Sequence, residues 1–117
     1  MNARAELGSR GESAALDVYQ ARGFARVARN WRCPAGEIDL VVTRGGLLVF
    51  CEVKTRAGAA FGGGYEAVTP SKQRRLRRLA ELFVLEYGLT ASQVRFDVAS
   101  VMRERGELTV AIFEDAF

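Results

Sequence analysis

The stretch GEIDLVVTRGGLLVFCEVKTR, residues 36–56, decides the fold of this chain. It contains two apolar runs, 37–44 and 47–56, joined by glycines at positions 45 and 46. The β-branched and aromatic residues of these runs predict two strands that are buried on both faces. The two glycines predict a two-residue hairpin turn, because such turns require positive φ angles.

Charged residues lie inside this apolar hairpin. A two-residue turn places Asp39 directly opposite Glu52 and Glu37 opposite Lys54. Two opposed carboxylates repel each other unless one is protonated or a cation lies between them. Oxygen ligands without histidine or thiolate suit Mg²⁺ or Mn²⁺, and Lys54 could orient a water or stabilise a developing oxyanion. The pattern predicts a metal site for phosphodiester hydrolysis. The alternative is an edge hairpin with a Glu37–Lys54 ion pair and two solvated carboxylates.

The composition narrows the function classes. The 117 residues include no histidine, carry a net charge of +3 and are 49% hydrophobic. This length and composition predict one globular domain over residues 1–117, and the lack of histidine excludes Ser-His-Asp triads, Cys–His pairs and HExxH zinc sites. Cys33 and Cys51 have no CxxC spacing, and no signal peptide or membrane span is recognisable. We expect a cytoplasmic protein with reduced thiols.

Caps and periodicity predict two helices and five strands. The first helix is expected to begin at a capping box formed by Ser9 and Glu12 and to end near Arg22. The second is expected over Pro70 to Tyr87, with Thr69 as its N-cap and Gly88 as its stop. The resulting α-β-β-β-α-β-β order indicates an α/β fold with a mixed sheet flanked by helices. The predicted strands are 24–32, 37–44, 47–56, 94–102 and 107–113.

Asp39, twelve intervening residues and then Glu52, Val53 and Lys54 resemble the PD-(D/E)xK nuclease signature. GEIDLV with FCEVKTR, the GE pair of the first helix and RFDV near the end resemble, more specifically, the YraN-like family of small bacterial proteins. That family is related to restriction endonucleases and Holliday-junction resolvases, and the resemblance covers nearly the whole chain. It implies a restriction-endonuclease-like domain and a Mg²⁺-dependent endonuclease acting on DNA, including branched or otherwise structured DNA.

The resemblance also assigns roles to residues. Asp39 and Glu52 correspond to metal ligands, together with the Val53 carbonyl, and Lys54 corresponds to the catalytic lysine. Glu12 corresponds to a helix-borne glutamate that completes the metal site in resolvase-like relatives; the alternative is its place in the capping box. For the whole chain, the alternative to a nuclease is a non-catalytic nucleic-acid-binding module with the same fold. The likeness to resolvases also allows a homodimer, which the residues themselves do not specify.

The second helix carries a cluster of cations near its N-terminus. Cations there oppose the helix dipole, which favours a track for nucleic-acid phosphates over an ordinary solvated face. Lys72 and Gln73 are expected to lie nearest the site, and Arg56 to contact phosphate or pair with a carboxylate. The predicted nucleic-acid-binding residues are Arg56, Lys72, Gln73, Arg74, Arg75, Arg77 and Arg78.

Two other features have both structural and functional interpretations. The glycine-rich segment 57–64 is expected to be either a flap that closes over substrate, with an aromatic residue stacking on a base, or a slack connector. Asp97 lies in an apolar strand and is interpreted as a structural anchor paired with Arg95 or Arg56.

Overall fold

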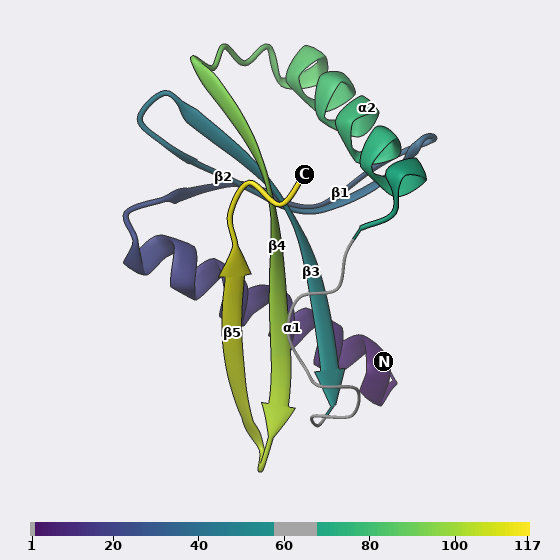
Figure 1. The fold of residues 1–117 in the computed structure, drawn as a ribbon, viewed down its shortest axis with the longest axis vertical. Helices are drawn as coiled ribbons and strands as arrows, with labels where there is room; N and C mark the ends of the chain where they lie inside the picture. The colour runs from purple at the N-terminus through teal and green to yellow at the C-terminus, as the bar shows by residue number, and fades with distance from the viewer. Residues whose placement is uncertain (1, 58–67) are drawn as a thin grey trace.

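The computed structural model describes residues 2–57 and 68–117, which form a mixed five-stranded sheet with a helix on each face (Figure 1). The strands lie in the order β1-β2-β3-β4-β5; β3 and β4 are parallel, and the other neighbours are antiparallel. The elements are α1 (Ala3–Ala21), β1 (Ala25–Cys33), β2 (Gly36–Arg44), β3 (Leu47–Ala57), α2 (Pro70–Tyr87), β4 (Gln93–Glu104) and β5 (Glu107–Phe113). The predicted α/β class, mixed sheet and element order are confirmed.

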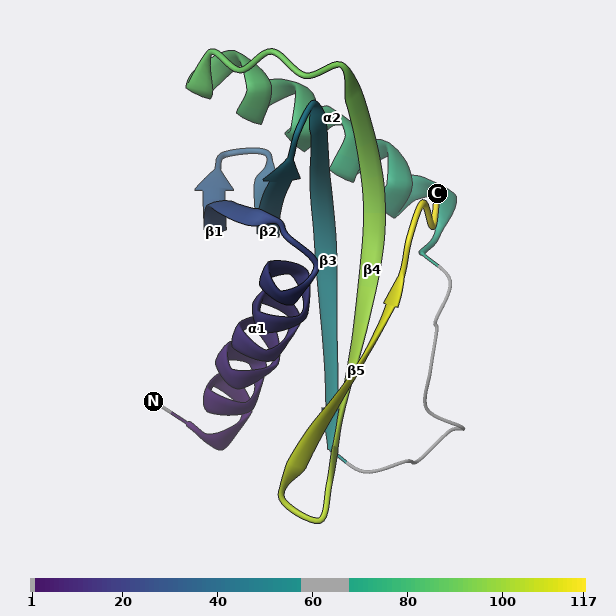
Figure 2. The same cartoon turned by 90° about the vertical axis from the view of Figure 1, so that its left-hand side faces the viewer.

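The two faces of the sheet carry separate apolar cores, one beneath each helix. In Figure 2, α1 lies along the lower half of β3 and α2 crosses the upper half. Leu16 and Tyr19 of α1 pack in a cluster with Val49, whereas Phe83 of α2 packs in a second cluster with Phe50. Adjacent strand residues point to opposite faces, so Val49 and Phe50 serve different cores. The prediction that the central strands are buried on both faces is therefore confirmed.

Helix α1 begins earlier than the sequence predicted. Asn2 is its N-cap, and the Asn2 side chain accepts a hydrogen bond from the backbone N–H of Ala5 at 2.8 Å. The predicted capping box is wrong, because Ser9 and Glu12 lie inside the helix. The preceding residues are mostly strong helix formers, and extending an existing helix over them is favourable. Both the carbonyl and the hydroxyl of Ser9 accept hydrogen bonds from Arg29 of β1 instead.

The β2–β3 hairpin has the predicted register. Arg44 pairs with Leu47 around the two-glycine turn, where Gly45 has a φ of +59°. The ladder then continues in the same register to Leu40 and Cys51. At that point the pairing of β2 with β3 ends.

The ladder stops just before Asp39 and Glu52, so these two residues do not form the expected backbone pair, and neither do Glu37 and Lys54. Beyond this point β3 stays paired with β4, whereas β2 turns away from it together with β1 (Figure 1). Asn30 of β1 has a left-handed φ of 54° in the stretch where the β1–β2 ribbon bends. The two strands therefore open into a gap at the carboxylates.

Helix α2 has the predicted bounds and caps. The Thr69 hydroxyl accepts a hydrogen bond from the Lys72 N–H at 3.2 Å, and Gly88 ends the helix with a left-handed φ of 62°. No helix of the described ranges is long and apolar enough to cross a membrane. The segment interpreted as a flap lies, after Ala57, outside the described residues.

Candidate metal and nucleic-acid site

Asp39 lies at the point where β2 separates from β3. Its Oδ2 atom accepts a hydrogen bond from the backbone N–H of Val53 at 2.9 Å. Burial raises the pKa of the Asp39 carboxyl to about 6, against the opposing effect of this hydrogen bond, and nearby Glu52 and Glu12 raise it further. The environment thus destabilises the ionised carboxyl, and a bound cation would offset this effect.

Glu52 of β3 is the second carboxylate at the gap, and its side chain is only 13% exposed. One oxygen, Oε1, lies 2.5 Å from the Nζ atom of Lys72. The other, Oε2, is buried and has no hydrogen-bond partner among the described residues. An ionised carboxylate oxygen accepts hydrogen bonds or binds cations, so a buried one without a partner is costly. Among the described residues, Glu52 therefore has a partner for only one of its two carboxylate oxygens.

Lys54 follows two residues later on the same strand. Burial lowers the pKa of its ammonium, and the positive charge of Lys72 lowers it further, whereas Glu52 opposes the shift. Lys54 therefore belongs to the same electrostatic cluster as the carboxylate. Its predicted partner Glu37 pairs with Arg32 instead, at 2.9 Å, because these two residues are directly opposite on β1 and β2.

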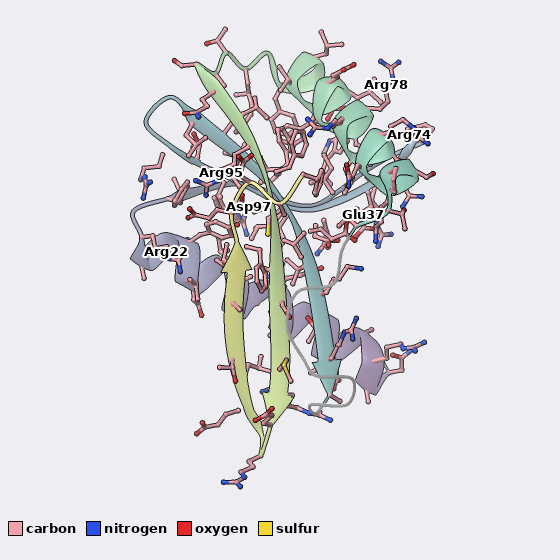
Figure 3. All side chains as sticks on the ribbon, in the orientation of Figure 1. Arg22, Glu37, Arg74, Arg78, Arg95 and Asp97 are labelled. Atoms are coloured by element: carbon pink, nitrogen blue, oxygen red, sulfur yellow. The ribbon has the colours of Figure 1, made fainter. Side chains whose placement is uncertain are left out.

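A cavity of about 300 Å³ lies between the two carboxylates and α2, and Lys54 is not among the residues that line it. Asp39 and Glu52 line it from the sheet, and Lys72 and Arg75 line it from α2. Figure 3 shows Glu37, which also lines this cavity, beside the first turns of α2. The cavity therefore brings together carboxylates from two strands and cations from a helix, an arrangement suited to an ion or a phosphate group.

Glu12 does not line this cavity. Its carboxylate accepts a hydrogen bond from the Asn30 side chain at 3.0 Å and lies 3.4 Å from Nε of Arg29. It borders a larger hollow of about 680 Å³ between α1 and the end of β3, yet it is near enough to raise the pKa of Asp39. Within the described ranges, no three Asp, Glu or Cys residues are grouped closely enough to hold a metal ion. The roles of Glu12 and of the Val53 carbonyl as ligands stay predictions.

The cations of α2 divide into different environments. Lys72 reaches the site, as predicted, whereas Gln73 turns back and its amide donates a hydrogen bond to the Val68 carbonyl at 2.9 Å. Arg77 lies over the ring of Phe96, 4.8 Å from its centroid. Arg75 lines the cavity, and Arg74 and Arg78 are exposed on the outer side of α2 in Figure 3. Arg78 also pairs with Glu81 of the same helix, at 3.4 Å. Arg56 is half-buried and borders the larger hollow beside α1.

Sequence reasoning missed the reason for a glycine at position 11. A Cβ atom on Gly11 would lie 1.9 Å from Oγ1 of Thr55, so α1 can approach β3 this closely only with a glycine there. The GE pair that carries part of the family resemblance therefore includes a packing contact next to the site. A glycine inside an otherwise good helix was the signal that could have revealed it.

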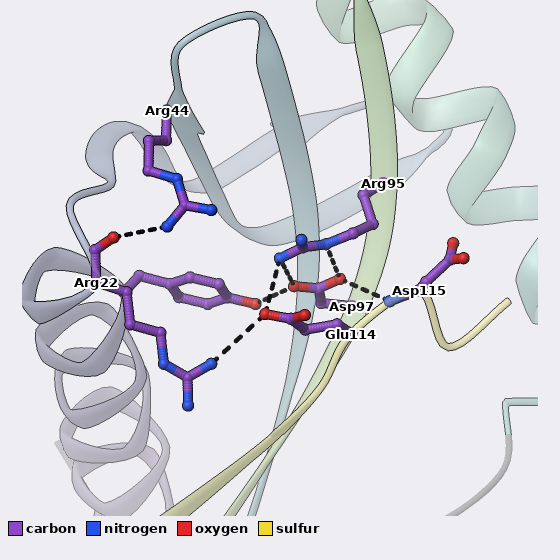
Figure 4. A network of polar contacts seen from close by, with 7 residues as sticks. Arg22, Arg44, Arg95, Asp97, Glu114 and Asp115 are labelled. Atoms are coloured by element: carbon purple, nitrogen blue, oxygen red, sulfur yellow. Dashed lines mark hydrogen bonds and ion pairs between the residues drawn. The ribbon is translucent and has the colours of Figure 1, made fainter.

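Asp97 has the structural role that the sequence predicted, with Arg95 as its partner. Arg95 donates two hydrogen bonds to the Asp97 carboxylate, both at 2.9 Å, and the Tyr19 hydroxyl donates a third at 2.7 Å (Figure 4). The backbone N–H of Asp115 donates a fourth at 3.0 Å. This fully buried carboxylate ties α1, β4 and the C-terminal residues together.

The fold and the cluster of Asp39, Glu52, Lys54 and Lys72 define an α/β protein with a polar site at the point where β2 and β3 separate. The chain belongs to the uncharacterised protein family UPF0102, whose family model matches residues 11–101, and the predicted YraN-like resemblance is confirmed. It is 46% identical to a UPF0102 protein of Renibacterium salmoninarum, over 92% of this chain and 91% of the relative. A UPF0102 protein of Beutenbergia cavernae is 50% identical over 90% and 89% of the two chains, and one of Symbiobacterium thermophilum is 46% identical over 95% of each.

Proposed function

We propose that this protein is a metal-dependent nuclease that hydrolyses phosphodiester bonds in DNA. The observation that carries the proposal is the state of Glu52. One of its carboxylate oxygens is bound by an ammonium, the other is buried without a partner in the described part of the chain, and the side chain shares a cavity with Asp39. A divalent cation would supply the missing partner and neutralise both carboxylates.

The donor set fits Mg²⁺ or Mn²⁺. Asp39 and Glu52 offer hard oxygen ligands, and Mg²⁺ in proteins is commonly held by one or two carboxylates while several waters complete its shell. Asp39 and Glu52 would hold the ion, with the Val53 carbonyl as a further ligand. When bound, the ion lowers the pKa of a coordinated water and offsets charge that develops on the phosphoryl oxygens.

The protein's own side chains then position the phosphodiester. Lys54 stands beside Glu52 on β3, where its Nζ can donate a hydrogen bond to a phosphoryl oxygen or to the attacking water. Arg75 lines the cavity, and Arg74 and Arg78 extend positive charge along the exposed side of α2. Such a row of cations binds the phosphate backbone without reading base sequence.

A cleavage assay tests the proposal. Linear, nicked, flapped and four-way DNA, with a matched RNA duplex, are incubated with the protein and Mn²⁺ or with a chelator. We expect cleavage of DNA only with the metal. Lys54→Met should abolish cleavage while keeping the fold, and Arg10→Met, which removes an exposed cation of α1, should cleave like the wild type. Failure to bind Mn²⁺, measured by calorimetry, would refute the nuclease.

One observation favours the second candidate, a nucleic-acid-binding module without catalysis. In the folded chain the site brings the carboxylates of Asp39 and Glu52 next to cations of α2. No cluster of three possible metal ligands occurs in the two described ranges. A module of this kind would bind the same nucleic acids through α2 with equal affinity in Mn²⁺ and in chelator. Binding without cleavage of any substrate would support this module over the nuclease.

A further inference from the structure

We propose that Lys72 is an internal competitor of the metal: it neutralises Glu52 in the metal-free protein, and on metal binding it moves to a phosphate of the nucleic acid. The inference rests on the proposed function and adds a mechanism that couples the two ligands. It assigns to one lysine of α2 two successive partners, first a carboxylate of the protein and then a phosphate of the substrate.

The contact itself is the first argument. Lys72 Nζ lies 2.5 Å from Glu52 Oε1, and the exposed fractions of the two side chains are 30% and 13%. Lys72 stands in the first turn of α2, which contains no acidic residue, and its backbone N–H is fixed by the Thr69 cap. A cation at this end of a helix is unfavourable on its own, so the ion pair with Glu52 holds the ammonium in place.

The second carboxylate oxygen of Glu52 also favours the exchange, because it has no partner among the described residues. An ammonium is a compact point charge, and here it contacts one carboxylate oxygen and leaves the buried Oε2 without a partner among the described atoms. A divalent ion held between Glu52 and Asp39 would satisfy this oxygen and bring a larger charge. The Lys72 contact is therefore a partial substitute for the metal, and the two cations compete for the negative charge of the same carboxylate.

Charge repulsion is the third argument. Lys54 stands two residues from Glu52 on β3, so a cation bound at Glu52 would lie beside both Lys54 and Lys72. A divalent ion on Glu52 would add two further positive charges beside both lysines, and like charges this close together repel each other. The flexible stem of Lys72 and its partial exposure let the ammonium leave. A phosphate beside the same cavity then gives it a new partner.

This exchange couples metal to nucleic acid. The Lys72 ammonium and the metal repel each other on one carboxylate, so the Lys72 contact lowers the metal affinity of the free protein. A phosphate that captures Lys72 removes this competition, so nucleic acid strengthens metal binding. By linkage, the metal strengthens nucleic-acid binding by the same factor.

Calorimetric titration of Mn²⁺ into the DNA-free protein tests the competition. We expect Lys72→Met to bind Mn²⁺ about tenfold more tightly than the wild type, a change of roughly 1.4 kcal/mol. Arg74→Met is the matched control, because it removes an exposed cation from the same helix turn, and its affinity should stay within about twofold of the wild type. Lys72→Arg keeps the charge and should not bind more tightly than the wild type.

Thermal denaturation gives a second readout that does not depend on activity. In chelator, Lys72→Met should melt below Arg74→Met, because the buried Glu52 loses its counter-charge. Saturating Mn²⁺ should close this gap. If Lys72→Met does not fold in chelator, Lys72→Gln, which can still donate a hydrogen bond, is used for both measurements.

The outcomes separate the two proposals. If the wild type binds Mn²⁺ and Lys72→Met binds it equally or more weakly, the competitor role is wrong and the metal site stands. If neither protein binds Mn²⁺, both the metal site and the competitor role are refuted. Tighter binding by Lys72→Met, with a smaller gain in Mn²⁺ affinity on adding a non-cleavable phosphorothioate DNA, supports the exchange.

Discussion

The Oδ2 atom of Asp39 accepts a hydrogen bond from the backbone N–H of Val53, at 2.9 Å, across the gap where β2 leaves β3. A side-chain carboxylate takes the place that a backbone carbonyl of β2 would occupy if the ladder continued. The hydrogen bond satisfies the exposed edge of β3 and holds Asp39 beside Glu52. Asp39 therefore has a structural role in the metal-free protein in addition to its proposed role as a ligand.

Asp39 should give the stability of the metal-free protein a distinct pH dependence. Its pKa is raised from 3.8 to about 6, mainly by burial, so the folded state holds this proton more tightly than the unfolded chain. The free energy of unfolding should therefore fall as the pH rises from 4 to 6 and then level off. Asp39→Asn keeps a side-chain oxygen that accepts the Val53 N–H hydrogen bond, but it has no ionisable carboxyl. Its free energy of unfolding at pH 7 should therefore exceed that of the wild type by roughly 3 kcal/mol at most.

Urea denaturation in chelator between pH 4 and 8 measures this effect. Asp17→Asn, which removes an exposed carboxylate of α1, controls for the change in net charge. Parallel stability curves for wild type and Asp39→Asn would contradict the raised pKa. Saturating Mg²⁺ should offset the fall of the wild-type curve between pH 4 and 6, because the metal stabilises the ionised carboxylate in the folded state.

Replacing Gly11 by alanine should destabilise the protein. The new Cβ would lie 1.9 Å from Thr55 Oγ1 and 2.9 Å from Thr55 Cβ, so α1 must shift away from β3. Overpacking of this kind costs about 1–3 kcal/mol. Gly8→Ala, in the same helix and with no atom within 4 Å of the new Cβ, should instead gain about 0.5–1 kcal/mol from helix propensity. Urea denaturation at one pH compares them; equal shifts for the two variants would disprove the close-approach argument.

The buried Asp97 should be one of the most sensitive positions for stability. Asp97→Asn removes the charge that pairs with Arg95, and we expect a loss of about 3–5 kcal/mol. Tyr19→Phe removes a single hydrogen bond to the same carboxylate and should cost about 1.5–3 kcal/mol. Denaturant midpoints measure both losses. A loss below 1 kcal/mol for Asp97→Asn would show that the network is not a principal anchor.

The arginines of α2 should separate into binding and packing residues. Arg74→Ala and Arg75→Ala should each weaken DNA binding and reduce the slope of log affinity against log salt by about 1. Arg77→Ala should mainly lower stability, because this side chain lies over the rings of Phe96 and Phe117. Fluorescence anisotropy at several salt concentrations, with thermal melts of each variant, measures both properties. A salt slope reduced by Arg77→Ala alone would contradict this division.

Local features of the sequence predicted those parts of the fold that depend on near neighbours. The Gly45–Gly46 pair sets the hairpin register, since the turn and the first strand pairs form between adjacent segments. Thr69 and Gly88 set the ends of α2 for the same reason. Asp97 was recognisable as an anchor because a charge in an apolar strand requires a partner, and Arg95 stands two residues away.

The predicted start of α1 is wrong because the capping-box pattern pointed to Ser9. Asn2 caps the helix in the folded chain. In the folded chain Ser9 and Glu12 have partners on β1, Arg29 and Asn30, which no local pattern reveals. The longer helix also covers more of the sheet.

The sequence by itself determined which residues form the candidate site: Asp39, Glu52 and Lys54 stand out because charge in an apolar hairpin is costly. Only the tertiary structure decided how they are arranged. The ladder ends before Asp39, where β3 keeps its pairing with β4 while β2 stays with β1, and β4 is distant from the hairpin in sequence. The contact of Lys72 with Glu52 likewise depends on α2 packing across the sheet. Turns and periodicity encode short-range order, whereas the opening of the site results from long-range packing.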